Sequence, residues 1–323
     1  MFRAPLLAIL LLAAAVLLAG CNDGKRLQQD VRAALAKNAE ITSYRFSGEA
    51  EFKLTQSVPD PAGNPLTSRL AAKLSSGKLT WEGAVSTGPY RMELNLRLNP
   101  EGETTGYEIP VLVLDKTMYV HIPGLNAPDE YYLIDLEPAS GAKGPGGGTQ
   151  PGLLAEAGPL FSSFLSDFVG ALRPGRFSER EGPPGERIIV VTVEPERCGE
   201  AAGAWLNAAA AAVNRLELAG HIGPARAEGW RERIAGTDAD HYRLEKPLEI
   251  SLSIDEAGFV RETAFDVAVS SADAAGDGSV WLAKMTGRYD GINEEPPFAM
   301  PLPDNVKPFA EILNLLGSAQ LEQ

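Results

Sequence analysis

The chain has 323 residues and is acidic, with 29 lysine and arginine residues against 43 aspartate and glutamate residues and a formal net charge of −14. An acidic surface repels phosphate backbones and anionic headgroups, which excludes nucleic acid as a partner and limits membrane contact to apolar groups or a local basic patch. Hydrophobic residues make up 44% of the chain, enough to build the core of one large β-rich domain or two small ones.

The N-terminus carries a short basic start followed by an apolar run. Arg3 is its only charged residue, and the fourteen residues from Leu6 to Ala19 are uninterrupted and apolar. As a helix this run would rise only ~21 Å, less than the ~30 Å hydrocarbon core of a bilayer. A basic end, an apolar middle and a small-residue exit are typical of a secretory signal peptide, which predicts an extracytoplasmic protein.

The end of this segment, Leu18-Ala19-Gly20-Cys21, resembles the lipobox of bacterial lipoproteins. The resemblance implies cleavage between Gly20 and Cys21, acylation of the Cys21 thiol with palmitate-type chains, and often acylation of the new amino terminus. We therefore expect a signal peptide at 1–20, a lipidated tether at 21–26, and a protein anchored to the cell membrane on its extracytoplasmic side. The alternative is an ordinary signal peptide whose cleavage site falls near a cysteine.

Loss of residues 1–20 removes one positive charge, Arg3, so the formal charge goes from −14 to −14 − 1 = −15. Cys198 is then the only cysteine left unmodified, so no internal disulfide forms. We expect Cys198 to act as a small buried hydrophobic residue rather than a reactive thiol.

The next segments alternate between one helix and several strands. Apolar residues at helical spacing, from Leu27 to Leu35, predict a helix at about 26–40. Strict alternation predicts half-buried strands that start near Tyr44, Tyr90, Leu248 and Phe259. Further strands are expected at about 67–74, 78–85, 107–114, 117–122, 131–136, 187–194 and 280–290, with a hairpin turn at Asp255–Gly258.

Helices interrupt this β pattern in the middle and near the end. Pro159 suits the first turn of a helix that carries Phe161, Phe164 and Phe168 on one face. An alanine-rich helix is predicted at 199–218, and Asp304 is a plausible N-cap for a last helix that reaches Leu316. Residues 141–152, rich in glycine and proline, are expected to form a surface loop.

The predicted fold class is α+β. Many antiparallel strands with one apolar face need a cover, and the economical solution is a strongly curved half-barrel that receives amphipathic helices on its concave face. The order of elements resembles the LolA/LppX-type lipoproteins, through the strand Ser43–Gly48, the late strand ending at Asn293 and the Pro301-Leu302-Pro303 segment. The resemblance implies one domain over 27–323, with the loop at 141–152 and a helical insertion at about 158–218, and an interior that holds acyl chains.

Catalytic signatures are weak. His121, His221 and His241 are widely separated, and the Ser75–Lys78 segment has the Ser-x-x-Lys spacing but lies in a predicted turn between strands. Asp273–Gly278 lacks the ligand spacing of an EF-hand and is better explained as a hairpin turn. We expect no enzyme activity, no metal site and no cofactor.

We therefore expect a monomeric, membrane-anchored lipoprotein that binds a lipid or another hydrophobic ligand in a cavity between sheet and helices. The protein partner is not predicted. The alternative is a structural or interaction lipoprotein of the cell surface, in which the same side chains fill a closed core. The residues expected to line the cavity are Tyr44, Phe46, Phe52, Met92, Leu94, Leu96, Phe161, Phe164 and Phe168.

Overall fold

The computed structural model describes residues 23–54, 75–136, 151–271 and 280–309, which fall into two compact units. Unit 1 comprises Met1–Glu40, Pro159–Arg215 and Pro224–Gly278, and unit 2 comprises the remaining three segments, of which Ile41–Gly158 is the largest. The predicted signal peptide with Cys21, the strand at 67–74, the turn at 273–278 and most of the 141–152 loop lie outside the described residues.

Unit 1 combines helices with an antiparallel sheet. Its helices cover residues 23–38, α3 (Pro151–Ala171, in this unit from Pro159), α4 (Cys198–Leu218, in this unit to Arg215) and α5 (Pro224–Ala235). The sheet has the order β11-β10-β8-β7, with β9 also paired to β11. The strands are β7 (Phe177–Glu181), β8 (Glu186–Val193), β9 (Tyr242–Leu244), β10 (Leu248–Asp255) and β11 (Val260–Ser271).

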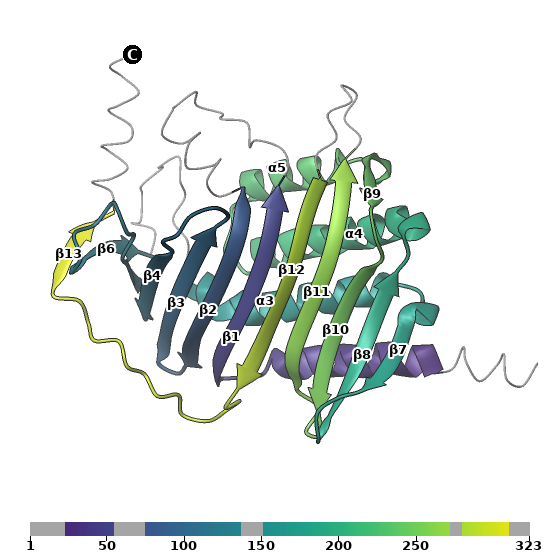
Figure 1. Cartoon of the computed structure of the whole chain (residues 1–323), viewed down its shortest axis with the longest axis horizontal. Helices are drawn as coiled ribbons and strands as arrows, with labels where there is room; N and C mark the ends of the chain where they lie inside the picture. The colour runs from purple at the N-terminus through teal and green to yellow at the C-terminus, as the bar shows by residue number, and fades with distance from the viewer. Residues whose placement is uncertain (1–22, 55–74, 137–150, 272–279, 310–323) are drawn as a thin grey trace, which may run out of the picture. The chain divides into compact units, whose positions relative to one another are not determined.

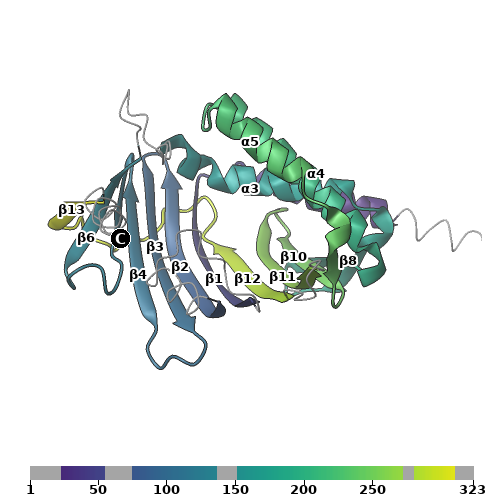
Figure 2. The ribbon, with the colours of Figure 1, turned by 90° about the horizontal axis from the view of Figure 1, so that it is seen from above.

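The core of unit 1 is closed. Val31 of the first helix, Phe168 of α3, Ile189 of β8 and Leu252 of β10 are at most 1% exposed and belong to one cluster of buried side chains. Figure 2 shows α4 and α3 on one side of β8 and β10, which is where these side chains meet. The helical spacing of Leu27, Val31 and Leu35 therefore marked the buried face of the first helix correctly.

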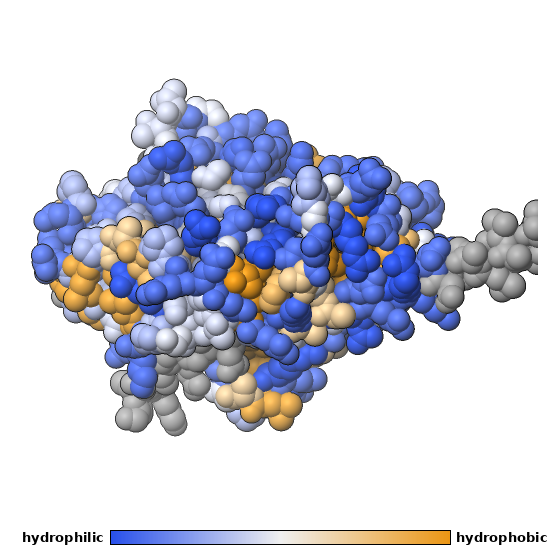
Figure 3. All heavy atoms as spheres, turned by 90° about the horizontal axis from the view of Figure 1, so that it is seen from below, coloured by the Kyte–Doolittle hydropathy of each residue, from blue (hydrophilic) through white to orange (hydrophobic). Residues whose placement is uncertain are grey.

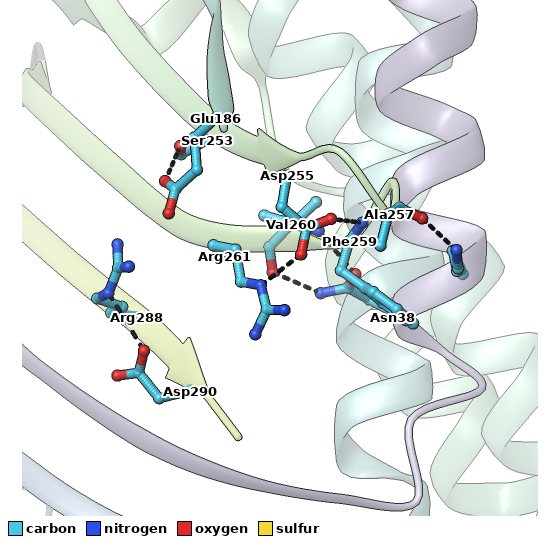
Figure 4. Close-up of polar contacts among 11 residues, drawn as sticks. Asn38, Glu186, Ser253, Asp255, Ala257, Phe259, Val260, Arg261, Arg288 and Asp290 are labelled. Carbon is cyan, nitrogen blue, oxygen red and sulfur yellow. Dashed lines mark hydrogen bonds and ion pairs between the residues drawn. The ribbon is translucent and has the colours of Figure 1, made fainter. Parts of the chain in front are cut away.

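The turn between β10 and β11 fixes the first helix to this sheet (Figure 4). Asp255 accepts a hydrogen bond from the Phe259 amide at 2.9 Å, and Gly258 has the positive φ of +84° that the turn requires. Asn38, the last residue of the helix, donates to the Val260 carbonyl at 3.0 Å and accepts from the Val260 amide at 2.9 Å. The predicted hairpin at Asp255–Gly258 is thus confirmed.

Unit 2 is built on a long meander. Its strand order is β13-β6-β5-β4-β3-β2-β1-β12, and all neighbours are antiparallel except β13 and β6 (Figure 1). The strands are β1 (Ser43–Leu54), β2 (Ser76–Thr87), β3 (Tyr90–Pro100), β4 (Tyr107–Leu114), β5 (Thr117–Val120), β6 (Glu130–Asp135), β12 (Val280–Asp290) and β13 (Asn305–Pro308).

The α+β class and the mostly antiparallel pairing are therefore as predicted, while the curvature of the sheet stays a prediction. Among the described residues, no helix has the length and apolar character needed to span a membrane.

Two helix predictions were wrong in detail. α3 starts at Pro151, so Pro159 lies inside the helix, at the cost of one backbone hydrogen bond, instead of opening it. Residues Asn305–Pro308 form β13, because the edge of β6 offers free backbone groups that pair with Val306 and Lys307. The predicted continuation of that helix to Leu316 lies outside the described residues. The polar helix α5 was not predicted, since its charged sequence gives little hydrophobic periodicity.

Two aromatic rings in unit 2 lie over glycines of the neighbouring strand. Trp81 of β2 is opposite Gly48 of β1, and Phe46 of β1 is opposite Gly83 of β2. A Cβ atom added at Gly48 would lie 2.4 Å from Cζ2 of Trp81, and one at Gly83 would lie 2.6 Å from Cζ of Phe46. Both added atoms would also collide with a backbone oxygen of the neighbouring strand, so movement of the ring alone would not relieve the clash. The glycines let the rings lie close to the sheet.

Substitution of these glycines by alanine should destabilise unit 2. We expect Gly48→Ala and Gly83→Ala each to lower the free energy of unfolding by about 1–3 kcal/mol, because the added methyl group overpacks the ring and the backbone. Gly203→Ala is the control, since an added Cβ there meets open space in the middle of α4 and should stabilise by up to about 1 kcal/mol. Urea unfolding measures all three; equal effects at the three glycines would contradict the packing described.

Candidate functional site

The strand register of unit 2 places a large set of apolar side chains on one face of the sheet. Directly opposite residues in an antiparallel pair share a face, so Phe46 of β1, Leu94 of β3 and Val111 of β4 form one row across the strands. Tyr44, Met92 and Val113 form the neighbouring row. We call this surface the apolar face; it consists of Tyr44, Phe46, Phe52, Leu79, Trp81, Val85, Tyr90, Met92, Leu94, Leu96, Leu98, Ile109, Val111, Val113, Met118, Val120, Ile134, Met285 and Tyr289.

Six of the nine predicted lining residues lie on this face, and they come from only two strands. Tyr44, Phe46 and Phe52 come from β1, while Met92, Leu94 and Leu96 come from β3. Trp81 lies between them on β2 and was not predicted as a lining residue. The alternation Leu79, Trp81, Gly83, Val85 was available in the sequence and would have identified it.

The apolar face is only half-buried over most of its area. All six predicted residues and Trp81 are intermediate in exposure, in contrast to the closed core of unit 1. The one fully buried cluster of unit 2 among the described residues contains Val111, Val113 and Leu136, at the β4 end of the face. The surface visible in Figure 3 is mostly hydrophilic, with apolar residues gathered in separate patches. A broad, half-buried apolar surface on one side of a sheet is the kind of surface that takes up a ligand or a partner.

The other three predicted residues lie on α3 in unit 1, and they have different surroundings. Phe168 is 1% exposed and belongs to the core cluster. Phe164 packs against that cluster, and its ring makes an edge contact with Trp205 of α4 at 4.5 Å between centroids. Phe161 is 45% exposed. Phe168 therefore fills the core of unit 1. This is the placement expected in the alternative in which these side chains form a closed core.

Three tyrosines gather where β1 and β3 begin and β12 ends. The rings of Tyr44 and Tyr289 make an edge contact at 5.4 Å between centroids, and Tyr90 is near enough to disfavour ionisation of Tyr44. Burial raises the pKa of all three hydroxyls above the ordinary value, that of Tyr90 to about 12. One end of the apolar face therefore carries neutral hydrogen-bonding groups beside aromatic and thioether side chains.

The opposite, polar face of the same strands carries a groove of about 490 Å³ under the segment that follows β12. The buried Glu93 accepts a hydrogen bond from the Ala299 amide at 2.8 Å and is paired with Arg91, whose Nη2 also donates to the Met300 carbonyl at 2.9 Å. Arg45, Asp290 and other polar groups line the groove. Glu93 and Arg91 thus fix the segment that follows β12 to the sheet, which is a structural role.

No catalytic arrangement is found among the described residues. Within them, no group of three or more histidine, cysteine or carboxylate side chains could hold a metal ion. Burial raises the pKa of the Cys198 thiol, which packs against the core of unit 1, so the thiol is kept in its less reactive protonated form. Lys78 of the Ser-x-x-Lys segment is paired with Glu49 at 2.7 Å across the strands.

The tyrosine cluster makes a prediction for alkaline pH. In the unfolded chain tyrosine loses its proton near pH 10, whereas Tyr90 in the folded protein holds its proton to about pH 12. The unfolded state therefore binds fewer protons in this window, and stability falls as the pH rises through it. We expect Tyr90→Phe to make this fall shallower in urea unfolding between about pH 10 and 12. The control is the same comparison near pH 8, where both states are neutral; an unchanged slope would contradict burial of the hydroxyl.

Comparison with known proteins gives distant structural similarity and no family match. No family model and no curated protein sequence matches the chain. The fold is similar to that of LprF from Mycobacterium bovis, at 13% identity and a TM-score of 0.36, over 86% of this chain and 97% of that one. A structure of lipovitellin described for its lipid–protein interactions is similar at 11% identity and a TM-score of 0.29, over 82% of this chain and 26% of that one. A β-barrel-like protein of unknown function from Brucella abortus has 9% identity and a TM-score of 0.19, over 77% of this chain and all of that one.

Proposed function

We propose that this protein is a membrane-anchored, extracytoplasmic lipoprotein that binds a hydrophobic ligand on the apolar face of unit 2, without catalysis. The observation that carries the proposal is the half-buried state of this face, which leaves side chains such as Trp81, Leu94 and Leu96 in partial contact with water. In the proposed state the sheet curves around the ligand, which takes the place of that water.

The burial of an acyl chain on this face would supply enough free energy for binding. Each buried methylene group contributes about 0.8 kcal/mol, so a twelve-carbon segment gains up to ~10 kcal/mol before the costs of ordering and association. No ion pair is needed for this gain, which agrees with a face formed almost entirely by aliphatic, aromatic and methionine side chains. Met92, Met118 and Met285 have flexible thioether side chains that adapt to different ligand shapes.

The tyrosines suggest which way an amphiphilic ligand lies. Tyr44, Tyr90 and Tyr289 supply hydroxyls at one end of the face, while Phe52 and Leu98 lie toward the other end of their strands. A ligand with a polar group and an apolar chain would place its polar group beside the hydroxyls. Its chain would run along β1 and β3 over the flat rings of Phe46 and Trp81.

Ligand binding is tested by a pair of variants on adjacent residues of β3. Leu96→Asn changes the apolar face, and Arg97→Asn introduces the same residue on the exposed opposite face. We expect Leu96→Asn to weaken the binding of a fluorescent fatty acid by about 10–100-fold, as the burial of one leucine side chain implies. Arg97→Asn should leave the affinity within about twofold.

Mass spectrometry of an organic extract of the purified protein complements the titration. About one lipid molecule per protein is expected in the extract. A protein without co-purifying lipid whose affinity for the probe is unaffected by Leu96→Asn would contradict the proposal and favour the structural or interaction role.

The anchor is tested separately through Cys21. Cys21→Ala removes the thiol that the proposed lipid modification requires, so the protein should move from the membrane fraction to the soluble extracytoplasmic fraction. Metabolic labelling with a palmitate analogue should mark the unaltered protein and not the variant. Cys198→Ala is the matched control and should remain at the membrane; equal labelling of both variants would contradict lipidation at Cys21.

A further inference from the structure

A small polar pocket lies in unit 1, whereas the apolar face belongs to unit 2, and the pocket is independent of the proposed function. It has a volume of about 230 Å³ and is lined by three elements: the end of the first helix, α3 and α4. The first helix contributes Leu35 and Ala36, and Ala39 follows its last residue, so the groups from this part of the lining are all apolar. The polar groups are Ser162, Ser163, Ser166 and Asp167 of α3 and Arg215 of α4. The lining from α3 and α4 is therefore polar.

The spacing on α3 brings the four polar residues that line the pocket to one side of the helix. Ser162 and Ser166 are four residues apart, as are Ser163 and Asp167, so the two pairs lie in adjacent rows along the axis. Serine is a weaker helix former than alanine, yet it occurs three times on this surface of a helix whose residues are mostly apolar. Ser162 is among the buried polar residues of the chain.

Arg215 supplies an unsatisfied donor at this pocket. Its Nη2 donates to Oδ2 of Asp167, which neutralises that carboxylate, whereas its Nη1 is buried and has no hydrogen-bond partner among the described residues. A buried guanidinium nitrogen without a partner is costly, and folded proteins normally satisfy it with a protein group, a water molecule or a ligand.

The balance of donors and acceptors identifies the ligand chemistry. The free Nη1 group and three serine hydroxyls offer hydrogen-bond donors, and the one carboxylate of the pocket, Asp167, is already engaged by Arg215. A group with several acceptor oxygens matches this set of donors best, and a bond from a guanidinium to an oxyanion is charge-assisted. At ~30 Å³ of liquid volume per water molecule, the pocket has room for several oxygen atoms.

We propose that this pocket binds an oxyanion of the phosphate type, held by Arg215 and the serines of α3. The oxyanion belongs either to free inorganic phosphate or to a phosphate group carried by a larger molecule such as a short-chain phospholipid. In either case Arg215 keeps its ion pair with Asp167 and donates to the oxyanion through Nη1. The serine hydroxyls of α3 donate to the remaining oxygens.

The test is thermal unfolding of the purified full chain in detergent, with inorganic phosphate or dihexanoyl phosphatidylglycerol compared with chloride at equal ionic strength. We expect at least one of the two ligands to raise the melting temperature in a saturable manner. The Ser163→Ala/Ser166→Ala double variant should weaken the apparent affinity at least tenfold. Because alanine is the better helix former, this variant should itself melt no lower than the unaltered protein, so a loss of binding cannot be ascribed to misfolding.

Ser178→Ala, an exposed serine of β7, is the control and should bind as the unaltered protein does. Binding of phosphatidylglycerol alone would support the pocket as a headgroup site, and binding of phosphate would support the free ion. Three results would overturn the proposal: no shift with either ligand, a shift that the double variant retains, or a crystal structure grown in phosphate with only water at Arg215. Since Leu96→Asn acts in the other unit, its effect on fatty-acid binding is a separate result.

Discussion

The pairing register of β1, β2 and β3 is the constraint on which the candidate site depends. Side chains in a strand alternate between faces, so a shift of one residue would move Phe46 and Leu94 to the polar face and bring Arg45 and Asn95 to the apolar one. The glycines opposite Trp81 and Phe46 help to fix this register. An aromatic ring lies directly over each glycine, and the side chain of any other residue at that position would collide with the ring.

Apolar residues of the same types form a closed core in unit 1 and a half-buried face in unit 2. In unit 1 the side chains of five strands and three helices pack into one buried cluster, in which Val31 and Ile189 have an exposed fraction of 0%. In unit 2 the apolar face has a comparable composition, yet most of its side chains are half-buried among the described residues. A closed core stabilises a fold, whereas a half-buried face leaves free energy to be gained by binding. This contrast supports the proposal that the core of unit 1 stabilises the fold and that the apolar face of unit 2 binds the ligand.

Much of the fold could be predicted from the sequence because its strands are amphipathic. Strict alternation located β1, β3 and β10, and the spacing of Leu27, Val31 and Leu35 gave the buried face of the first helix. Elements fixed by tertiary contacts could not be predicted this way. Asn305–Pro308 has helix-compatible neighbours but pairs with the edge of β6, a partner about 175 residues earlier whose position no local pattern reveals.

The candidate site was predictable to a similar degree. The faces of β1 and β3 follow from alternation alone, which is why six expected residues lie together. Phe161, Phe164 and Phe168 share a helical face, but periodicity cannot tell a buried core from a ligand surface, and Phe168 belongs to the core. The Arg215 pocket could not be predicted at all, because α3 and α4 contribute residues about fifty positions apart whose meeting depends on helix packing.

The central claim is that an apolar ligand lies on the apolar face of unit 2. Photo-crosslinking with a diazirine-bearing fatty acid, followed by peptide mapping, tests it most directly. We expect the labels to be concentrated in the peptides of β1, β2 and β3 and to be displaced by an excess of unlabelled fatty acid. Labels confined to the peptides of unit 1, or a uniform distribution that competitor does not displace, would contradict it.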